Sequence, residues 1–204
     1  KNLIRAFERN EDIHDQTSNK VFGVDSGLDK HELRRRAKII NYALLYGKTA
    51  FSLSKDIGVT PQEAQAFIDA YFQGFPSVQS FIEDTLQIGR ENGIVKTMFG
   101  RRRRLPELTS HNGHLRSRAE REAVNMPVQG TAADILKRAM IDLHAALPPD
   151  TRMILTVHDE LVLETPSSQA VEVSELVRDK MENAVQLKVP LTVDVGIGQN
   201  WKEA

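Results

Sequence analysis

The segment from Arg34 to Gly47 constrains the fold of this chain most strongly, because its spacing predicts a helix with two different faces. At about 100° per residue, basic and aromatic side chains gather within an arc of about 100°. The residues that share this arc are Arg34, Lys38, Asn41 and Tyr42. The apolar residues between them point elsewhere and can pack, and Gly47 is expected to end the helix.

The cationic face of this helix suits a polyphosphate. Arg34 and Lys38 lie one turn apart, so a guanidinium fork and an ammonium group can bind neighbouring phosphates. Tyr42 lies one turn further and can pack on a sugar or base, and Tyr46 can extend this platform toward a template base. An ordinary amphipathic surface helix with a solvated basic stripe is the alternative interpretation of the same residues.

A second motif lies near the other end of the chain. Residues 153–157 and 160–164 are short runs rich in β-forming residues, and His158 and Asp159 between them predict a hairpin with a tight turn. Asp is common in turns for local reasons, so this turn also fits a purely structural role. Glu160 follows directly, however, and adjacent carboxylates repel unless a cation lies near. Mg²⁺ is the usual cation, because it takes hard oxygen ligands and bridges to phosphates.

Together, the helix and the hairpin tip resemble two signature motifs of family A DNA polymerases, the bacterial DNA polymerase I type. Four further segments carry the resemblance over essentially the whole chain: Glu11–His14, Phe99–Pro106, Asn125–Asp134 and Val195–Trp201. Six ordered matches are far more specific than one. The resemblance implies a template-directed polymerase of DNA replication and repair, which adds deoxynucleoside triphosphates to a primer 3′ end with two Mg²⁺ ions.

The resemblance also implies roles for residues near the incoming nucleotide. Arg34 and Lys38 are similar to the groups that bind and neutralise the triphosphate, and Lys38 counts among the catalytic residues because it stabilises charge on the leaving pyrophosphate. His14 is expected to assist at the phosphates, and Tyr42 to contact the nucleotide. Many bacterial members carry Phe where this chain has Tyr42, so we expect relaxed discrimination against dideoxynucleotides. The next position is often Gly, and here Ala43 is expected to tighten the space for the template.

Catalysis and DNA binding are expected to involve other residues. Asp159 is similar to one of two catalytic aspartates that bind the metal ions, with the catalytic Glu160 beside it. Template and primer are expected to contact Tyr46, Arg121, Asn125, Gln129 and His158. Of these, Asn125 and Gln129 resemble readers of the acceptor atoms in the minor groove.

The other metal-binding aspartate of the family lies in an Asp-Tyr-Ser-like strand upstream of the segment that begins here at Lys1. These residues do not contain it, and Asp159 alone is not expected to suffice for two-metal phosphoryl transfer. We therefore expect a C-terminal portion whose partner is the missing N-terminal polymerase segment, with thumb and aspartate strand. A noncatalytic fragment that binds DNA or nucleotides and one half of a split polymerase are the alternatives. A single-subunit RNA polymerase fits the helix and Glu160 less well, and ribonucleotide incorporation would distinguish it.

The net charge of −1 hides an asymmetry that also favours a nucleic-acid partner. Residues 1–138 contain 22 Lys and Arg against 17 Asp and Glu, whereas the remainder contains 5 against 11. The cluster Arg101–Arg104 suits backbone phosphates. A solvated charge run or a localisation signal is the alternative interpretation of that cluster.

The pattern of elements predicts an α+β fold with a small antiparallel sheet. The resemblance implies a mostly helical fingers subdomain over residues 1–124 and part of a palm that holds this sheet over residues 125–204. Thr60–Glu63 is a capping box that opens a helix whose aromatic residues are expected in the core. A helix from about 168 to 187 and a strand over Leu191–Val195 are predicted last. The chain has no Cys and no apolar run of membrane-spanning length, which is compatible with the cytoplasm. The resemblance implies a cytoplasmic protein at the bacterial nucleoid.

Overall fold

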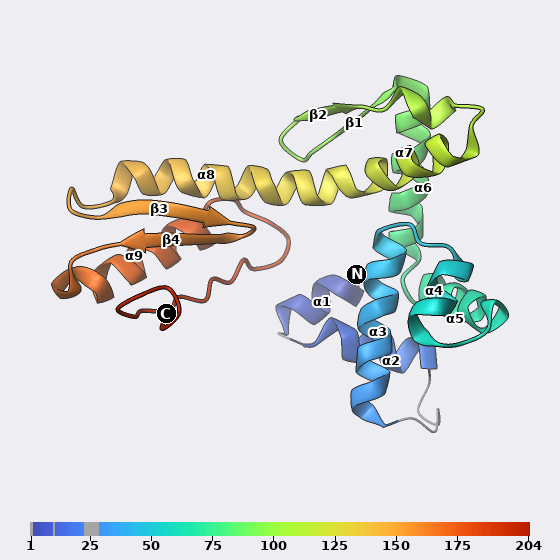
Figure 1. The fold of residues 1–204 in the computed structure, drawn as a ribbon, viewed down its shortest axis with the longest axis horizontal. Coiled ribbons are helices and arrows are strands. Elements are labelled where there is room, and N and C mark those ends of the chain that lie inside the picture. The colour runs from blue at the N-terminus through green and yellow to red at the C-terminus, as the bar shows by residue number, and fades with distance from the viewer. Residues whose placement is uncertain (1, 10, 23–28) are drawn as a thin grey trace. The chain divides into compact units, whose positions relative to one another are not determined.

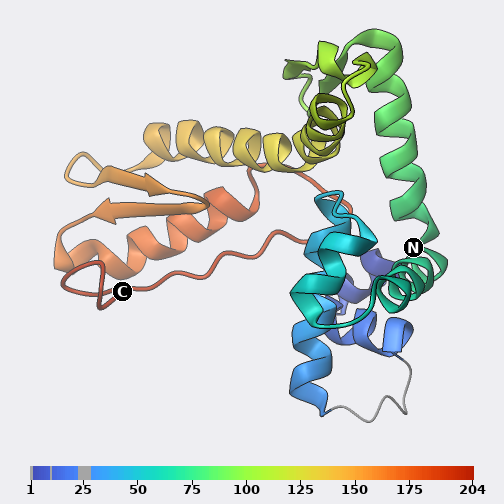
Figure 2. The ribbon, with the colours of Figure 1, turned by 45° about the vertical axis from the view of Figure 1, so that its right-hand side comes forward.

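The computed structural model describes residues 2–9, 11–22 and 29–204. The chain divides into two compact units, residues 1–128 and 129–204. Figures 1 and 2 show the elements of each unit. The border lies slightly after the predicted one, and the names fingers and palm remain a prediction for these units.

The described part of the first unit is helical except for one short hairpin. Its elements are α1 (Asn2–Glu8), α2 (Ile13–Phe22), α3 (Lys30–Leu45), α4 (Ala50–Ile57), α5 (Pro61–Gly74), α6 (Pro76–Asn92), β1 (Ile94–Lys96), β2 (Arg102–Arg104), η1 (Pro106–Thr109) and α7 (Gly113–Asn125). Among the helices that the structure describes in either unit, none combines the length and apolar content needed to cross a membrane.

Local signals set the ends of these helices, and two of them, at Thr60–Glu63 and Gly47, were predicted. The Asp29 side chain caps α3 by accepting a hydrogen bond from the Glu32 backbone N–H at 2.9 Å. The predicted capping box of α5 is formed between Thr60 and Glu63 in both directions. Gly47 follows the end of α3 with a φ of 66°, a left-handed conformation that favours glycine.

The main core of the first unit lies between α3, α4 and α5. Ile40 and Leu53 are fully buried there. Tyr71 is also buried, with Phe67 and Phe72 packed against the same cluster, which confirms the predicted core role of the aromatic residues on α5. Burial raises the pKa of Tyr71 to about 12, because the interior disfavours a phenolate. This core holds α3 so that its polar face stays at the surface.

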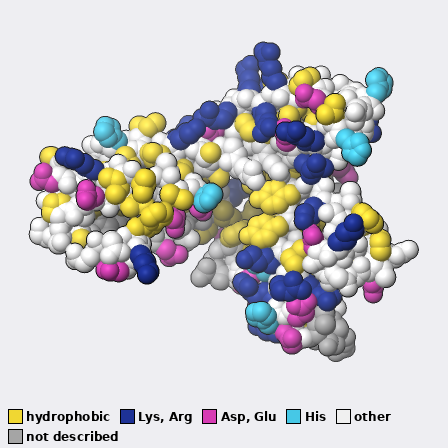
Figure 3. All heavy atoms as spheres, viewed as in Figure 1, with side chains coloured by type: hydrophobic (Ala, Val, Ile, Leu, Met, Phe, Trp, Pro, Cys, Tyr) yellow, Lys and Arg dark blue, Asp and Glu magenta, His cyan; other side chains and the backbone are white. Residues whose placement is uncertain are grey.

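A smaller core lies beneath the β1–β2 hairpin. β1 pairs antiparallel with β2. Val95 pairs with Arg103 and is buried against α7 and η1, so Arg103 lies on the inner side and reaches Glu122 at 2.6 Å. Because side chains alternate along a strand, Arg102 and Arg104 lie on the opposite face. Figure 3 shows Lys and Arg side chains gathered over this hairpin.

The second unit packs two helices against one face of a hairpin. Its elements are α8 (Thr131–Ala146), β3 (Arg152–Val157), β4 (Glu160–Glu164), η3 (Ser167–Gln169) and α9 (Ala170–Glu182). β3 and β4 are antiparallel, with an irregularity between Met153 and Leu155. Leu143, Val173 and Val177 of the helices form the core with Met153, Leu161 and Leu163 of the strands. Both units contain helices and a small antiparallel sheet, which confirms the α+β prediction.

The strand predicted over Leu191–Val195 is wrong, and α9 ends earlier than predicted. A strand requires a neighbouring strand to satisfy its backbone. Here the Val193 N–H donates to Glu182 Oε1 at 2.9 Å, and the Arg178 Nε–H donates to the Val193 carbonyl at 3.3 Å. Side chains at the end of α9 therefore take the backbone bonds that a strand would offer to a sheet.

Candidate functional site

The predicted nucleotide-binding residues lie together on the surface where α2 packs beside α3. His14 stands in the first turn of α2, and its ring centroid lies 6.0 Å from that of Tyr42. Tyr46 stacks on Tyr42 with ring planes 7° apart and centroids separated by 6.3 Å. Arg34 and Lys38 precede Tyr42 by two turns and one turn on the same helix. Figure 3 shows cationic side chains over the first half of α3 and apolar side chains over its second half.

Asp12 organises the cationic end of this surface. The Arg34 Nε–H and Nη2–H donate to Asp12 Oδ2 at 3.0 and 2.6 Å, and Asp15 lies 3.7 Å from the same guanidinium. Asp12 Oδ1 also accepts from the backbone N–H groups of His14 and Asp15. The bonds from Arg34 are the main reason that the pKa of Asp12 lies below its ordinary value. One carboxylate thus orients both Arg34 and the segment that carries His14.

Replacing Asp12 with Asn tests this ion pair, because Asn can still accept the backbone N–H groups while the charge is lost. A carboxylate with a lowered folded-state pKa stabilises the fold above its unfolded pKa, near 3.8, and loses that contribution as the pH falls through the folded-state value. We expect Asp12→Asn to lower Tm at pH 7 by at most about 4 °C. The difference from the wild type should shrink below pH 3.8 in thermal unfolding scans. A difference that is constant with pH would contradict this role.

Asn41 does not lie on the exposed face where its spacing placed it. It stands at the edge of the predicted arc and is only 7% exposed. Its carboxamide lies between Thr17 and His14 of α2, with hydrogen bonds to both. Packing of α2 against this edge of α3 buries a position that an isolated helix would expose.

Arg121, a predicted template or primer contact, lies near Gly47, which follows the end of α3. A Cβ atom added to Gly47 would stand 3.2 Å from Arg121 Cγ. The Arg121 Nη1–H donates to Ser117 Oγ at 2.9 Å, one turn earlier on α7. This bond directs an exposed guanidinium, and the structure brings Arg121 close to the turn that follows Tyr46.

Asn125 and Gln129 bracket an irregular turn of helix. Asn125 is the last residue of α7, and Gln129 lies in η2 (Met126–Gly130), a π-helical segment that leads into α8. Pro127 within it has no N–H to donate to a carbonyl four residues earlier, so the regular ladder of hydrogen bonds cannot continue. Asn125 is half-buried and Gln129 is exposed, and they belong to different units.

The predicted carboxylate hairpin forms in the second unit. β3 ends at Val157 and β4 begins at Glu160, so His158 and Asp159 make a two-residue turn. His158 has a φ of 55°, a left-handed conformation that His, Asn and Asp adopt more often than other residues with a side chain. The three residues at the tip, His158, Asp159 and Glu160, are exposed. Pairing of the strands fixes the backbone from which the two carboxylates project.

The hairpin tip supplies part of a magnesium site. Asp159 and Glu160 offer carboxylate oxygens, and Mg²⁺ commonly takes one or two protein carboxylates together with substrate phosphates and water. Within residues 2–9, 11–22 and 29–204, no group of three or more His, Cys, Asp or Glu side chains is arranged to hold a metal ion. Carboxylate oxygens are the type of ligand that Mg²⁺ prefers, but Asp159 and Glu160 could fill only part of its coordination shell.

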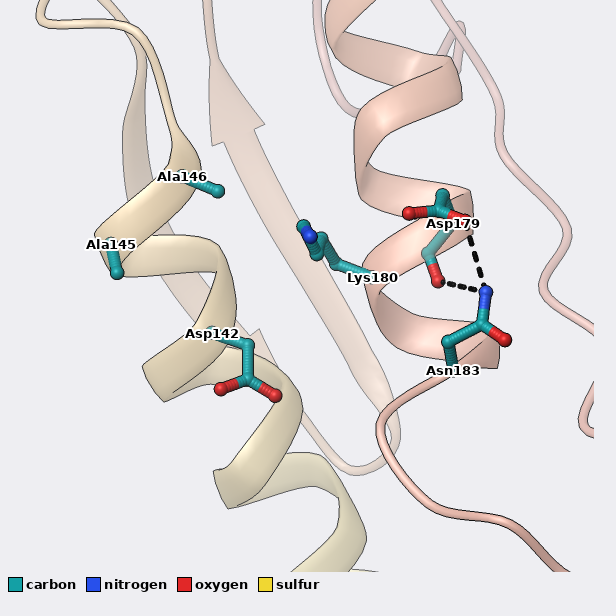
Figure 4. A pocket seen from close by; sticks show the side chains of 6 residues that line it. All are labelled: Asp142, Ala145, Ala146, Asp179, Lys180 and Asn183. Atoms are coloured by element: carbon teal, nitrogen blue, oxygen red, sulfur yellow. Dashed lines mark hydrogen bonds between the residues drawn. The ribbon is translucent and has the colours of Figure 1, made fainter.

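A shallow pocket of about 340 Å³ lies between α8 and α9, and no predicted site residue lines it. It is lined by Asp142, Ala145, Ala146, Asp179, Lys180 and Asn183. Figure 4 shows the two aspartates on opposite helices and Asn183 bonded to Asp179, with both donor–acceptor distances at 2.9 Å. Asp179 and Asn183 bond to each other at the end of α9, and the lining contains none of the predicted site residues, so we do not include this pocket in the candidate site.

These features can be compared with known proteins. The sequence model of DNA polymerase family A matches residues 1–203. The chain belongs to DNA polymerase family A. "DNA polymerase I, thermostable" from Thermus filiformis is 50% identical over the whole chain, and DNA polymerase I from Streptococcus pneumoniae is 46% identical over 99% of it. The chain spans 24% of each of these relatives.

A solved structure shows the same family A fold. It is described as "POL domain of Pol1 from M. smegmatis complex with DNA primer-template and dNTP". The likeness has a TM-score of 0.91 at 41% identity, and it covers 99% of this chain and 36% of that one. The family A resemblance and the fold class are therefore confirmed, whereas the roles of individual residues remain predictions.

Two polar residues of this family A chain had not been singled out from the sequence, although both contact predicted ones. Asp12 stands two residues before His14 at the start of a helix, a position typical of a capping side chain. Thr17 follows His14 by three residues and so lies on the same side of α2. These local spacings were visible, but their partners on α3 were not.

Proposed function

We propose that this chain is the C-terminal portion of a template-directed DNA polymerase that adds deoxynucleoside triphosphates to a primer 3′ end. The observation that carries the proposal is the surface of α2 and α3, where an imidazole, two cations and two stacked tyrosines lie side by side in a chain of this family. Phosphates need the cations and a nucleobase needs the aromatic rings, so one triphosphate fits both. The basic outer face of the β1–β2 hairpin supports a DNA partner.

Each side chain of this surface has a distinct task in the proposed reaction. Arg34 and Lys38 bind the triphosphate and offset the charge that develops on pyrophosphate. His14 donates a hydrogen bond to a phosphate oxygen. Tyr42 packs on the incoming nucleotide, and Tyr46 stands at the template position. The predicted contacts with primer and template are Arg121, Asn125, Gln129 and His158.

Asp159 would hold Mg²⁺ in this reaction, with Glu160 beside it. Bound Mg²⁺ stabilises charge on the phosphates and lowers the pKa of the attacking 3′-OH. The remaining carboxylate would come from the upstream polymerase segment, because the described residues hold no complete cluster of ligands. We propose the cytoplasm as the place of this activity.

Primer extension with Mg²⁺ tests the proposal, first with the chain alone and then with a polypeptide that carries the upstream family segment. Extension only in the mixture supports the polymerase hypothesis. The active site would then be formed by this chain together with the upstream polypeptide. Binding of primer-template without extension in either sample would favour the noncatalytic binding fragment. Extension by the chain alone would show that the upstream aspartate is dispensable. Preference for ribonucleotides would indicate an RNA polymerase.

Tyr42 gives a prediction about substrate choice. Its hydroxyl can take the place of the contact normally made through the sugar 3′-OH, and the side chain is 47% exposed on the candidate surface. We expect Tyr42→Phe to raise the ratio of deoxy- to dideoxynucleotide incorporation by about tenfold or more, since a lost hydrogen bond to substrate costs about that much in discrimination. Chain-termination assays with both enzymes in the extending mixture measure it. Equal termination would contradict the assigned role.

A further inference from the structure

A chain of buried hydrogen bonds runs behind the candidate nucleotide surface. Thr17 Oγ1 lies 3.0 Å from Asn41 Oδ1, and Asn41 Nδ2 lies 2.9 Å from His14 Nδ1. Thr17 is fully buried and Asn41 is 7% exposed, so neither can exchange these partners freely for water. These hydrogen bonds link Thr17, on the interior side of α2, through Asn41 of α3 to the His14 imidazole at the surface.

The Thr17 hydroxyl helps to decide which groups donate and which accept in these hydrogen bonds. Its hydroxyl has one proton and stands near two acceptors, Asn41 Oδ1 and the Ile13 carbonyl, which lies 2.9 Å away. The Ile13 carbonyl lies one turn before Thr17 in α2 and takes the helical N–H bond. The structure turns Asn41 Oδ1 toward Thr17 and Nδ2 toward His14, and a buried carboxamide oxygen without a donor would be costly, so the hydroxyl proton serves Asn41 Oδ1.

The orientation of Asn41 then fixes the proton on His14. With Oδ1 turned to Thr17, the Nδ2–H groups face His14 Nδ1, and an amide nitrogen only donates. His14 Nδ1 must therefore offer its lone pair. A neutral ring with one proton carries it on Nε2, and an imidazolium would set two N–H groups against each other.

Charged groups around His14 have opposite effects on its pKa. Asp12 and Asp15 favour the imidazolium, whereas Arg34 and Lys38 disfavour it. Burial is the largest influence, and it lowers the pKa of His14 below its ordinary value. The surroundings thus favour a neutral ring, and the hydrogen bonds decide which of its two nitrogens carries the proton.

We propose that Asn41 and Thr17 are positioning residues that keep His14 neutral with its proton on Nε2, ready to donate to an anionic phosphate oxygen. The donation to a triphosphate rests on the proposed function, whereas the state of the ring does not. The positioning matters because the alternative neutral form would present a lone pair on Nε2 to an anion, and that contact is repulsive.

Nitrogen NMR of the histidine rings tests the proposal in the 204-residue chain labelled with ¹⁵N-histidine. His14→Gln identifies the resonances of His14 among the six histidines. We expect a protonated Nε2 and an unprotonated Nδ1 at neutral pH. A protonated Nδ1, alone or in an imidazolium, would overturn the proposal, because the Asn41 amide would then have to be turned around.

Matched variants separate the hydrogen-bond chain from general packing. Thr17→Ser retains the hydroxyl and should keep the wild-type ring signals. Thr17→Val has nearly the shape of Thr without the hydroxyl, so Asn41 can turn and a protonated Nδ1 should appear. In Asn41→Asp the carboxylate accepts from Nδ1–H, and the pKa of His14 should rise by about 1 pH unit or more. Identical ring signals in Thr17→Val and Thr17→Ser would overturn the role of Thr17.

Adding a magnesium deoxynucleoside triphosphate to the wild-type chain distinguishes this inference from the proposed function. A shifted Nε2 resonance, with its proton retained, supports both. If the ring is in the expected form but the triphosphate leaves Nε2 unchanged, positioning by Asn41 stands and nucleotide binding at this surface fails. If the ring is in the other form while triphosphate still binds, only the positioning fails.

Discussion

Asp159→Asn is expected to reduce Mg²⁺-dependent primer extension by about a thousandfold or more in the mixture that contains the upstream polymerase segment. The substitution keeps the size of the side chain at the hairpin tip and removes its charge. A neutral amide binds Mg²⁺ far less well than a carboxylate, so the ion would lose the partner that fixes it to this hairpin. Single-turnover extension rates with saturating primer-template measure the loss.

Asp150→Asn is the matched control for this experiment. Asp150 is also an exposed aspartate of the second unit, but it lies between α8 and β3 and not at the hairpin tip. It should extend primers at the wild-type rate. Primer-template binding by Asp159→Asn should remain close to that of the wild type, because the loss concerns the metal. An Asp159→Asn variant as active as the control would remove Asp159 from the metal site.

Leu53→Ala is expected to cost about 2–5 kcal/mol of the free energy of unfolding of the first unit. Leu53 has no exposed surface, and it packs with Ile40 and Ile57 in the core that supports α3. The substitution removes apolar contacts and leaves a cavity that rigid helices fill only partly. Because domains are stabilised by about 5–15 kcal/mol in total, this loss is a large fraction.

Phe51→Ala is the control on the same helix. It deletes a larger side chain, but Phe51 is 61% exposed and its ring lies 4.2 Å from the Lys55 ammonium. Loss of this cation–π contact should cost less than about 1 kcal/mol. A control that destabilises the protein as much as Leu53→Ala would show that burial is not the cause.

Urea unfolding can follow the two units separately, because their fluorescent residues differ. The three tyrosines, Tyr42, Tyr46 and Tyr71, lie in the first unit, and Trp201 is the one tryptophan and lies in the second. Leu53→Ala should lower the midpoint of the tyrosine transition. If only the tryptophan transition moved, the assignment of Leu53 to the core of the first unit would be wrong.

The elements that the sequence predicted well depend on residues close together in the chain. The capping box of α5 spans four residues, the turn at His158 and Asp159 joins adjacent strands, and Gly47 ends α3 by its own conformation. Such signals act within a single turn of helix or one hairpin. The family resemblance could be identified for a related reason, since its motifs are short and occur in a characteristic order.

The outcomes that the sequence did not reveal all involve partners far apart in the chain. Asp12 reaches Arg34 across 22 positions, and Asn41 reaches Thr17 and His14 across 24 and 27. Spacing alone placed Asn41 on an exposed face, and β propensity placed a strand over Leu191–Val195. Packing of α2 against α3 buried Asn41. Side chains of α9 form hydrogen bonds with the backbone of Val193, in place of a neighbouring strand. The sequence by itself determined the helix caps and turns that neighbouring residues set, because those choices are local. Only the tertiary structure decided which polar groups meet and where α9 ends, because burial and hydrogen-bond partners depend on what packs against each face.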